Sequence, residues 1–249
     1  MNLDAAPYLS LVVPAYNEAR RLPPTFAELA EFCGRFTFPY EVLIVVERSS
    51  DGTLEIATAQ TAQQAFFEVI DNKVHRGKGF AVRTGMMRAR GDIILYMDAD
   101  LSVPLREIHS FLACLEAHPE IDLVLGNRQH AHSRITRRQS WLRRSMGQAF
   151  NRLLHALSLV SIRDTQCGFK AFRRAAAHAI FSRQTLDGFA FDVEVVLLAG
   201  KLGHKIADLP VEWINSPESR VQIIRDSVRM VRDTWRVRSH LRQSFPPES

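Results

Sequence analysis

Two aspartates separated by a single residue, Asp98 and Asp100, follow a short apolar run within the segment LYMDADLS. Carboxylates in such a DxD motif can point in one direction once the chain leaves a strand, and together they can hold a divalent cation. Mg²⁺ or Mn²⁺ held in this way keeps open positions for the phosphate oxygens of a substrate. The pair therefore predicts a binding site for a metal ion and a diphosphate. The alternative is an exposed polar loop that merely follows a strand.

Apolar runs that alternate with helical patterns would position these residues. The apolar runs are rich in Val, Ile and Leu, mostly lack polar alternation, and cover residues 9–16, 41–47, 66–71, 92–98 and 121–127. Helical patterns cover residues 25–36, 53–64, 78–90, 105–117 and 189–203, and a last strand candidate covers 204–213. Unbroken apolar strands are typical of a sheet that helices cover on both faces. The order predicts an α/β fold with a single, mostly parallel sheet of doubly wound type.

A doubly wound sheet binds its ligands at the carboxyl ends of its strands, so the polar residues at those ends are the candidates for function. They are Asn17, Glu18, Glu47, Asp98, Asp100, Asn127 and Arg128. The charge balance of 32 basic against 27 acidic side chains gives a net charge of +5. Such an excess suits a partner that carries phosphate, but it does not choose among nucleotides, anionic lipids and nucleic acid.

Length and composition limit the remaining classes. The 249 residues show no linker, repeat or low-complexity segment, which favours one domain over residues 1–249. Three widely spaced cysteines without CxxC spacing support neither a disulfide framework nor a zinc site, and they favour a reduced, cytoplasmic compartment. No apolar run approaches the roughly 18 residues of a spanning helix, and the N-terminus lacks the pattern of a signal peptide. We therefore expect a protein that is neither secreted by that route nor membrane-spanning.

Two basic segments follow Arg128. The first, RQHAHSRITRRQSWLRRSMGQAFNRLL, contains Arg143 and Arg144. The second, over residues 219–243, predicts a cationic amphipathic C-terminal helix, because arginines surround apolar residues at spacings of three and four, namely Val221, Ile224, Val228, Val231 and Trp235. This helix would either pack on the domain or lie on an anionic membrane surface. A remote alternative is that the first segment binds nucleic acid, which would leave the acidic pair without a task.

Seven short motifs come in the order seen in glycosyltransferase family 2, which the chain resembles over about residues 9–240. The motifs are VVPAYNE at 12–18, SSDGT at 49–53, RGKGFAVRTGM at 76–86, DADLS at 98–102, GNR at 126–128, DTQCGFK at 164–170 and FAFDVE at 189–194. The last two resemble most the dolichyl-phosphate β-glucosyltransferases, followed by the polyprenyl-phosphate mannose synthases. The resemblance implies a GT-A fold with a Rossmann-like nucleotide-binding half, and a metal-dependent, inverting glycosyltransferase.

The resemblance also implies roles for single residues. It places at the nucleotide sugar Pro14, Tyr16, Glu18, Asp98, Ala99 and Arg220. It implies that Asp100 is the principal ligand of Mg²⁺ or Mn²⁺, with Asp98 and Ser102 as further contacts. Arg128 resembles an arginine near the phosphates.

Glu47 and Lys78 are two further candidates for the predicted donor site. Members of the family usually carry two acids and a glycine after the second strand, whereas VVERSS keeps only Glu47, so we expect its contact with the base to differ. Lys78 lies between Gly77 and Gly79, and glycines let backbone N–H groups approach an anion. Lys78 is therefore a candidate contact to phosphate.

Charge sets the requirements of the reaction. Breaking a bond between a sugar and a diphosphate leaves extra negative charge on the leaving phosphate, which the metal and arginines would stabilise. A lipid phosphate acceptor is already an anion at neutral pH and needs no general base. Arg143 and Arg144 would hold it, since the guanidinium fork suits phosphate. A hydroxyl acceptor would instead need a carboxylate to take its proton, and Asp164 is then the candidate.

We therefore predict the inverting transfer of a hexose to a polyprenyl phosphate of the dolichyl or undecaprenyl type. The favoured donor is UDP-glucose, and we expect a peripheral protein on the cytoplasmic face of a membrane, without nucleic acid as a partner. One alternative is a mannose synthase that uses GDP-mannose. The other is an enzyme that acts on a hydroxyl acceptor with Asp164 as base.

Overall fold

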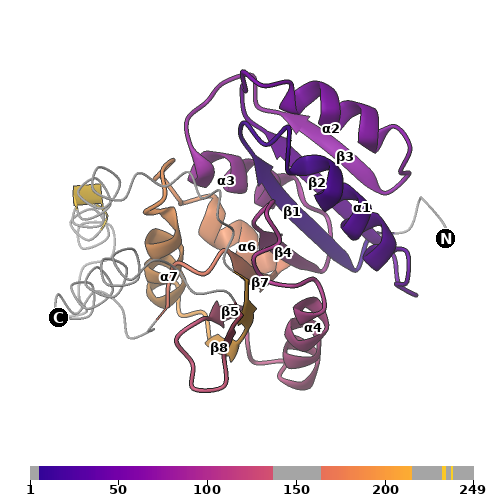
Figure 1. Ribbon diagram of the computed structural model, residues 1–249. Helices are drawn as coiled ribbons and strands as arrows, with labels where there is room; N and C mark the ends of the chain where they lie inside the picture. The colour runs from indigo at the N-terminus through magenta and orange to yellow at the C-terminus, as the bar shows by residue number, and fades with distance from the viewer. Residues whose placement is uncertain (1–5, 137–163, 215–231, 234–236, 238–249) are drawn as a thin grey trace.

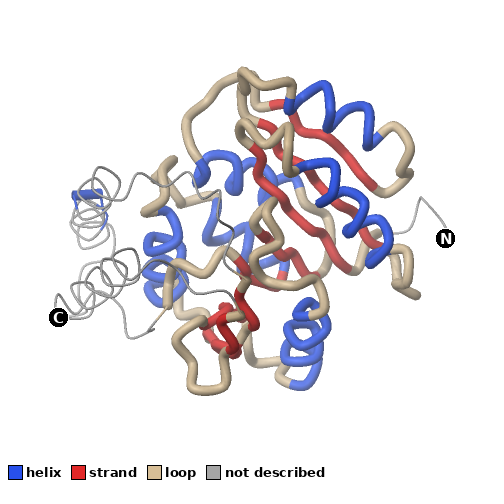
Figure 2. The backbone as a smooth tube through the Cα atoms, in the orientation of Figure 1, coloured by secondary structure: helices blue, strands red, loops and turns tan. Residues whose placement is uncertain are grey.

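The computed structural model describes residues 6–136, 164–214, 232, 233 and 237, and it contains a seven-stranded sheet between layers of helices (Figures 1 and 2). The strands lie in the order β3, β2, β1, β4, β7, β5, β8. Their bounds are β1 Leu9–Ala15, β2 Tyr40–Val46, β3 Phe67–Asp71, β4 Ile93–Met97, β5 Leu123–Asn127, β7 Phe169–Arg173 and β8 Ile206–Pro210. Neighbours are parallel except where β7 pairs with β4 and β5. The predicted α/β fold with a mostly parallel sheet is confirmed.

Helices cover both faces of the sheet. One apolar cluster contains side chains of α1 Leu22–Cys33, α2 Thr53–Thr61 and α4 Glu107–Ala117. The other contains side chains of α3 Lys78–Arg88, α6 Arg174–Phe181 and α7 Phe191–Lys201. Successive side chains of a strand point to opposite faces, so Leu11 and Val13 join the first cluster and Val12 joins the second. Central strands are consequently apolar at nearly every position, and β2 is buried throughout.

The close approach of α3 to the sheet depends on Gly85. A Cβ at this position would lie 2.3 Å from Cγ1 of Val12 and 2.9 Å from Cγ2 of Val45. Because glycine has no Cβ, α3 packs directly on β1 and β2. Its first residue, Lys78, is thereby held at the carboxyl edge of the sheet.

Three helices begin elsewhere than their sequence patterns suggest, and one of them, α7, begins at Phe191 instead of residue 189. The helix expected from Thr25 begins at Leu22, and a proline lies in its first turn, where a missing N–H costs no helical hydrogen bond. The helix expected from Leu105 begins at Glu107, whose N–H donates to the carbonyl of Pro104 at 3.0 Å. Residues 104–106 thus form a turn that precedes α4.

Several elements were not predicted. Strand β7 has the sequence FKAFR and is buried between β4 and β5, but its two cationic residues interrupt the apolar run by which a buried strand is recognised. Helix α6 follows it directly. The single strand expected over 204–213 is divided into β8 and the short β9, Glu212–Trp213, which pairs with β6, Arg134–Ile135, in a separate sheet.

The described part of the chain has no helix that is both long and apolar enough to cross a bilayer. Most of the amphipathic helix predicted over 219–243 lies outside the described residues. Of its described positions, Val237 is buried, with 4% of its surface exposed. The single domain over residues 1–249 stays a prediction.

Candidate active site

Hydrogen bonds join the loops that follow β1 and β2, which are parallel neighbours and end at the same edge of the sheet (Figure 1). Asn17 has a positive φ of 53°, and its side-chain oxygen accepts a hydrogen bond from the N–H of Ser50 at 2.8 Å. The N–H of Asn17 donates to Oγ of Ser49 at 3.0 Å, and that of Glu18 to Oγ1 of Thr53 at 2.8 Å. The motifs VVPAYNE and SSDGT therefore form one unit that fixes the neighbouring Tyr16.

The loop after β3 folds over Glu47, which is buried with 1% of its surface exposed. The Glu47 carboxylate accepts hydrogen bonds from the N–H groups of Arg76 and Gly77, both at 3.0 Å to Oε1, and Oε2 lies 2.6 Å from Nδ1 of His75. Through these contacts Glu47 holds the loop in place. They argue against a direct contact between Glu47 and the nucleotide. The His75 imidazole stacks on Tyr16, with ring centroids 3.7 Å apart and planes 6° apart. Sequence reasoning missed His75, because no motif marks it.

Asp98 lies at the end of β4 between a cation and a glycine. Its Oδ1 is 2.6 Å from Nζ of Lys78, and a Cβ on Gly168 would lie 2.1 Å from its Oδ2. Only glycine at position 168 leaves room for this carboxylate. Lys78, predicted to touch phosphate, is thus placed beside the acidic pair.

Asp100 is held by the turn that follows it. Its Oδ1 accepts hydrogen bonds from Oγ of Ser102 at 2.7 Å and from the N–H of Ser102 at 3.0 Å, while Leu101 takes a positive φ of 49°. Arg21 lies 3.7 Å from Oδ2 of Asp100 and also pairs with Glu18 at 2.5 Å. Ser102, predicted as a metal contact, therefore orients Asp100, and Glu18 is connected to the acidic pair through Arg21.

The acidic pair fits a divalent cation that shares its ligands with a substrate. Asp98 and Asp100 supply oxygen atoms only, which Mg²⁺ and Mn²⁺ prefer, and both side chains are partly exposed, at 38% and 19%. Within residues 6–136 and 164–214, no three His, Cys, Asp or Glu side chains are grouped so that they could hold a metal ion by themselves. The remaining ligand positions would therefore come from a bound phosphate or from water.

A buried network of charged side chains acts on Lys78 through Asp192. Lys170 is fully buried, pairs with Asp192 of α7, and donates to the carbonyl of Cys167 at 2.5 Å. The hydroxyl of Tyr96 donates to the same Asp192 carboxylate at 2.5 Å. Burial opposes the charge of Lys78, but the charges of Asp98 and Asp192 outweigh it and raise the pKa of the ammonium above its usual value. Sequence reasoning recognised the motif FAFDVE but gave Asp192 no role.

Arg128 and Asp164 form an ion pair that was not predicted, and the predicted place of Arg128 near the phosphates stays a prediction. Asp164 is fully buried and accepts from Nε and Nη2 of Arg128, each at 2.8 Å, and from the Arg128 N–H at 2.8 Å. Burial alone would raise the pKa of this carboxyl, but the Arg128 charge lowers it below its usual value. A carboxylate with a low pKa and three donors is a poor proton acceptor, which argues against Asp164 as a general base. The guanidinium carbon of Arg128 lies over the ring of Trp213, 5.7 Å from its centroid.

Of the remaining predicted residues, some form the backbone around the site and the others lie outside the described residues. Pro14 lies within β1 opposite Val45, and Ala99 is nearly buried, with its carbonyl accepting from Oγ1 of Thr25 at 2.6 Å. The positions that the structure does not describe are Arg143, Arg144 and Arg220.

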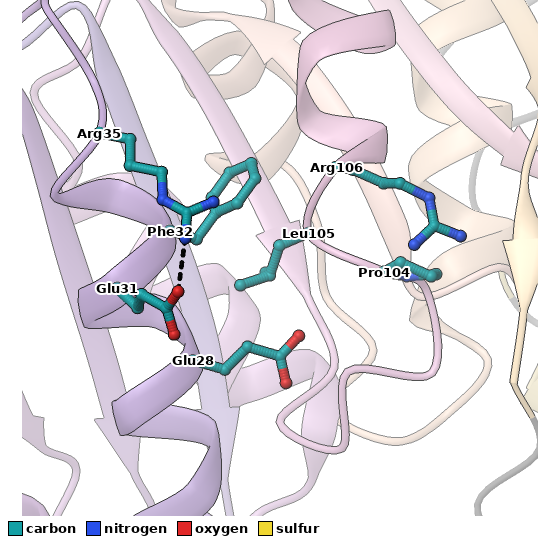
Figure 3. Close-up of a pocket in the computed structure, with 7 residues that line it drawn as sticks. All are labelled: Glu28, Glu31, Phe32, Arg35, Pro104, Leu105 and Arg106. Carbon is teal, nitrogen blue, oxygen red and sulfur yellow. Dashed lines mark hydrogen bonds and ion pairs between the residues drawn. The ribbon is translucent and has the colours of Figure 1, made fainter.

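A hollow of about 270 Å³ lies apart from these residues, between α1 and the turn before α4 (Figure 3). Its lining consists of Glu28, Glu31, Phe32, Arg35, Pro104, Leu105 and Arg106. Arg35, which follows the end of α1, pairs with Glu31 of that helix at 2.5 Å. The lining contains none of the predicted site residues, so we do not assign the hollow to the site.

The sheet, its helix layers and the acidic pair at the carboxyl edge are those of an α/β, GT-A type glycosyltransferase. The profile of glycosyl transferase family 2 matches residues 10–181, and the chain belongs to this family. The resemblance found in its motifs is thereby confirmed.

Relatives and solved structures agree with this assignment. The dolichyl-phosphate beta-glucosyltransferase of Dictyostelium discoideum is 33% identical over 93% of this chain and 74% of its own length. Mannosyl-3-phosphoglycerate synthase from Rubrobacter xylanophilus has a TM-score of 0.69 at 21% identity, over 98% of this chain and 77% of its own. Glucosyl-3-phosphoglycerate synthase from Mycobacterium tuberculosis, in complex with Mn²⁺, UDP and phosphoglyceric acid, has a TM-score of 0.67 at 19% identity, over 99% and 82%. The two structures establish the GT-A fold.

Proposed function

We propose that this protein transfers glucose from UDP-glucose to a polyprenyl phosphate of the dolichyl type, with inversion at the sugar. The likeness to a dolichyl-phosphate beta-glucosyltransferase over 93% of the chain carries this proposal. The arrangement of the carboxyl edge supports it independently. Hydrogen bonds join the loops after β1 and β2, an exposed aromatic pair joins those after β1 and β3, and the carboxylates after β4 lie beside Lys78 of α3.

The donor diphosphate would bind at Asp98, Asp100 and Lys78. Mg²⁺ or Mn²⁺ held by Asp98 and Asp100 would supply positive charge where the leaving diphosphate develops negative charge. Lys78 would orient Asp98 and remain close enough to contact a phosphate oxygen. Ser102 and Arg21 would keep the Asp100 carboxylate in place. The structural relative that binds Mn²⁺ and UDP supports this choice of metal and nucleotide.

The acceptor would be a phosphate rather than a hydroxyl. A phosphate oxygen is already an anion at neutral pH, so the attack needs no proton acceptor. Asp164, the candidate base for a hydroxyl acceptor, is buried and saturated by Arg128, which favours the phosphate. Arg143 and Arg144 stay predicted contacts to the acceptor, and Arg220 stays a predicted contact to the donor. A lipid acceptor would place the protein at a membrane surface, and its peripheral position on the cytoplasmic face stays a prediction.

Comparing two labelled donors with one acceptor tests the proposal. The purified chain would be incubated with Mg²⁺ or Mn²⁺, a short-chain polyprenyl phosphate, and either UDP-[¹⁴C]glucose or GDP-[¹⁴C]mannose. We expect labelled lipid from UDP-glucose and none above background from GDP-mannose. Labelled lipid from GDP-mannose alone would instead establish the mannose synthase. Transfer only to a free alcohol or glycan would overturn the phosphate acceptor.

A further inference from the structure

His75 has no predicted role, yet its ring stacks on Tyr16, which was predicted to contact the nucleotide sugar. The rings are nearly parallel, 3.7 Å apart, and neither is buried: Tyr16 is 37% exposed and the His75 side chain 44%. One face of the imidazole is covered by Tyr16. An aromatic surface that remains open to solvent at the ligand-binding edge of the sheet is suited to a planar ligand group.

Glu47 holds the imidazole in its orientation. Its carboxylate accepts from two backbone N–H groups of the same loop. A carboxylate only accepts hydrogen bonds, so the tautomer of His75 that fits the contact carries its hydrogen on Nδ1. The ring is thus fixed at an edge by Glu47 and on a face by Tyr16. Such a side chain binds a ligand with little further loss of rotamer freedom.

The loop from His75 to Lys78 connects the stack with the acidic pair. His75 contacts Tyr16 at one end, and Lys78 lies 2.6 Å from Asp98 at the other. Three residues of chain reach at most about 10 Å. In a nucleoside diphosphate, a ribose separates the base from the phosphates by a comparable length. One nucleoside diphosphate could therefore contact the aromatic surface and the phosphate site at the same time.

We infer that His75 is a nucleobase-contacting residue. The donor base packs on the face of the His75 imidazole that Tyr16 does not cover. This inference rests on the proposed function and deepens it. It also gives a role to Glu47, the acid that remains where the family usually has two. Glu47 is then a positioning residue, which acts on the base through His75.

Two substitutions at His75 separate its ring from its polar contact. His75→Gln removes the ring but can still donate a hydrogen bond to Glu47, whereas His75→Phe keeps the ring and loses that hydrogen bond. We expect calorimetric titration with UDP and Mn²⁺ to show about tenfold weaker binding for His75→Gln and a change within about threefold for His75→Phe. His118→Ala, an exposed histidine at the end of α4, is the control and should bind as the wild type does.

The reverse order, with His75→Phe weaker than His75→Gln, would show that His75 only satisfies Glu47 and would overturn the inference. Tighter binding in His75→Gln would also overturn it, because His75 would then compete with the base for Tyr16. Thermal unfolding of each variant checks that the comparison is made between folded proteins. Failure of the wild type to bind any nucleoside diphosphate would instead contradict the proposed function itself.

Discussion

The loops after β1 and β2 differ from the residues around β4 and β7 in the interactions that hold them. On the β1 and β2 side, backbone N–H groups and short polar side chains bond across partly exposed loops, as Asn17 does with Ser49 and Ser50. On the β4 and β7 side, buried charges pair across distant segments, as Lys170 does with Asp192 and Arg128 with Asp164. The contacts between the β1 and β2 loops are thus mainly hydrogen bonds of backbone N–H groups and neutral side chains, whereas those around β4 and β7 include buried ion pairs.

This difference predicts how each side responds to substitution. A neutral hydrogen bond contributes about 1 kcal/mol, and its loss at an exposed loop leaves groups that water can satisfy. Removing one member of a buried ion pair leaves an uncompensated charge, at a cost of about 3 to 5 kcal/mol. The β4 and β7 side should therefore be rigid but vulnerable to single changes, and the β1 and β2 side should tolerate them.

Asp192→Ala should cause the largest loss of stability. It leaves the Lys170 ammonium buried without its carboxylate and removes the acceptor of the Tyr96 hydroxyl, so we expect the free energy of unfolding to fall by about 3 to 5 kcal/mol. Urea unfolding measures this change. Replacing the pair together, with Lys170→Met and Asp192→Leu, should lose less than Asp192→Ala alone. An equal or greater loss in the double variant would mean that burial of charge is not the cause.

Asp164→Asn should lower stability by about 2 to 3 kcal/mol at pH 7, because hydrogen bonds to charged groups are lost. The folded pKa of Asp164 is lowered, so its contribution is complete above the unfolded pKa of about 3.9 and is lost as pH falls through the folded value. The difference between wild type and variant should therefore narrow below about pH 4. Unfolding measured between pH 7 and pH 3 tests the sign, and a gap that widens in acid would refute it.

Gly168→Ala should affect catalysis more than folding. The added Cβ would meet Oδ2 of Asp98 at 2.1 Å and push the carboxylate aside, so we expect kcat/KM for lipid glucosylation to fall by about 100-fold. Gly200→Ala in α7 is the matched control, because a Cβ there meets no atom within 4 Å. Similar activities for the two variants would contradict the placement of Asp98.

Asn17→Gly should have the smallest effect. Glycine accepts the positive φ but lacks the oxygen that receives the N–H of Ser50, so we expect a loss of about 1 kcal/mol in unfolding free energy. The KM for the donor should rise while kcat stays unchanged. A fall in kcat comparable to that of Gly168→Ala would remove the contrast between the two sides.

The same contrast explains what the sequence predicts well. Parallel strands such as β2 are unbroken apolar runs, and loops such as 16–19 and 49–53 carry their polar partners within short motifs. Strand β7 was not predicted because Lys170 and Arg173 interrupt its apolar residues, and groups that their side chains pair with or donate to lie in other segments of the chain. Hydrophobic periodicity reports only on neighbouring positions in the sequence, so it cannot identify such partners.

The site shows the same limit. Asp98, Asp100 and Lys78 were predicted from motifs, and the structure brings them together. The pairing of Asp164 with Arg128 was not predicted, because a sequence does not state which carboxylate is buried beside which arginine. His75 was missed for a related reason, since its meaning depends on Tyr16 and Glu47 in other loops.

Mn²⁺ binding can decide whether the acidic pair holds a divalent cation together with the donor diphosphate. Electron paramagnetic resonance would follow free Mn²⁺ during titration of the wild type and of Asp100→Asn, each with UDP present. We predict that the wild type binds Mn²⁺ only when UDP is present, and that Asp100→Asn weakens this binding by at least about tenfold. Equal Mn²⁺ binding by the two proteins would contradict the claim.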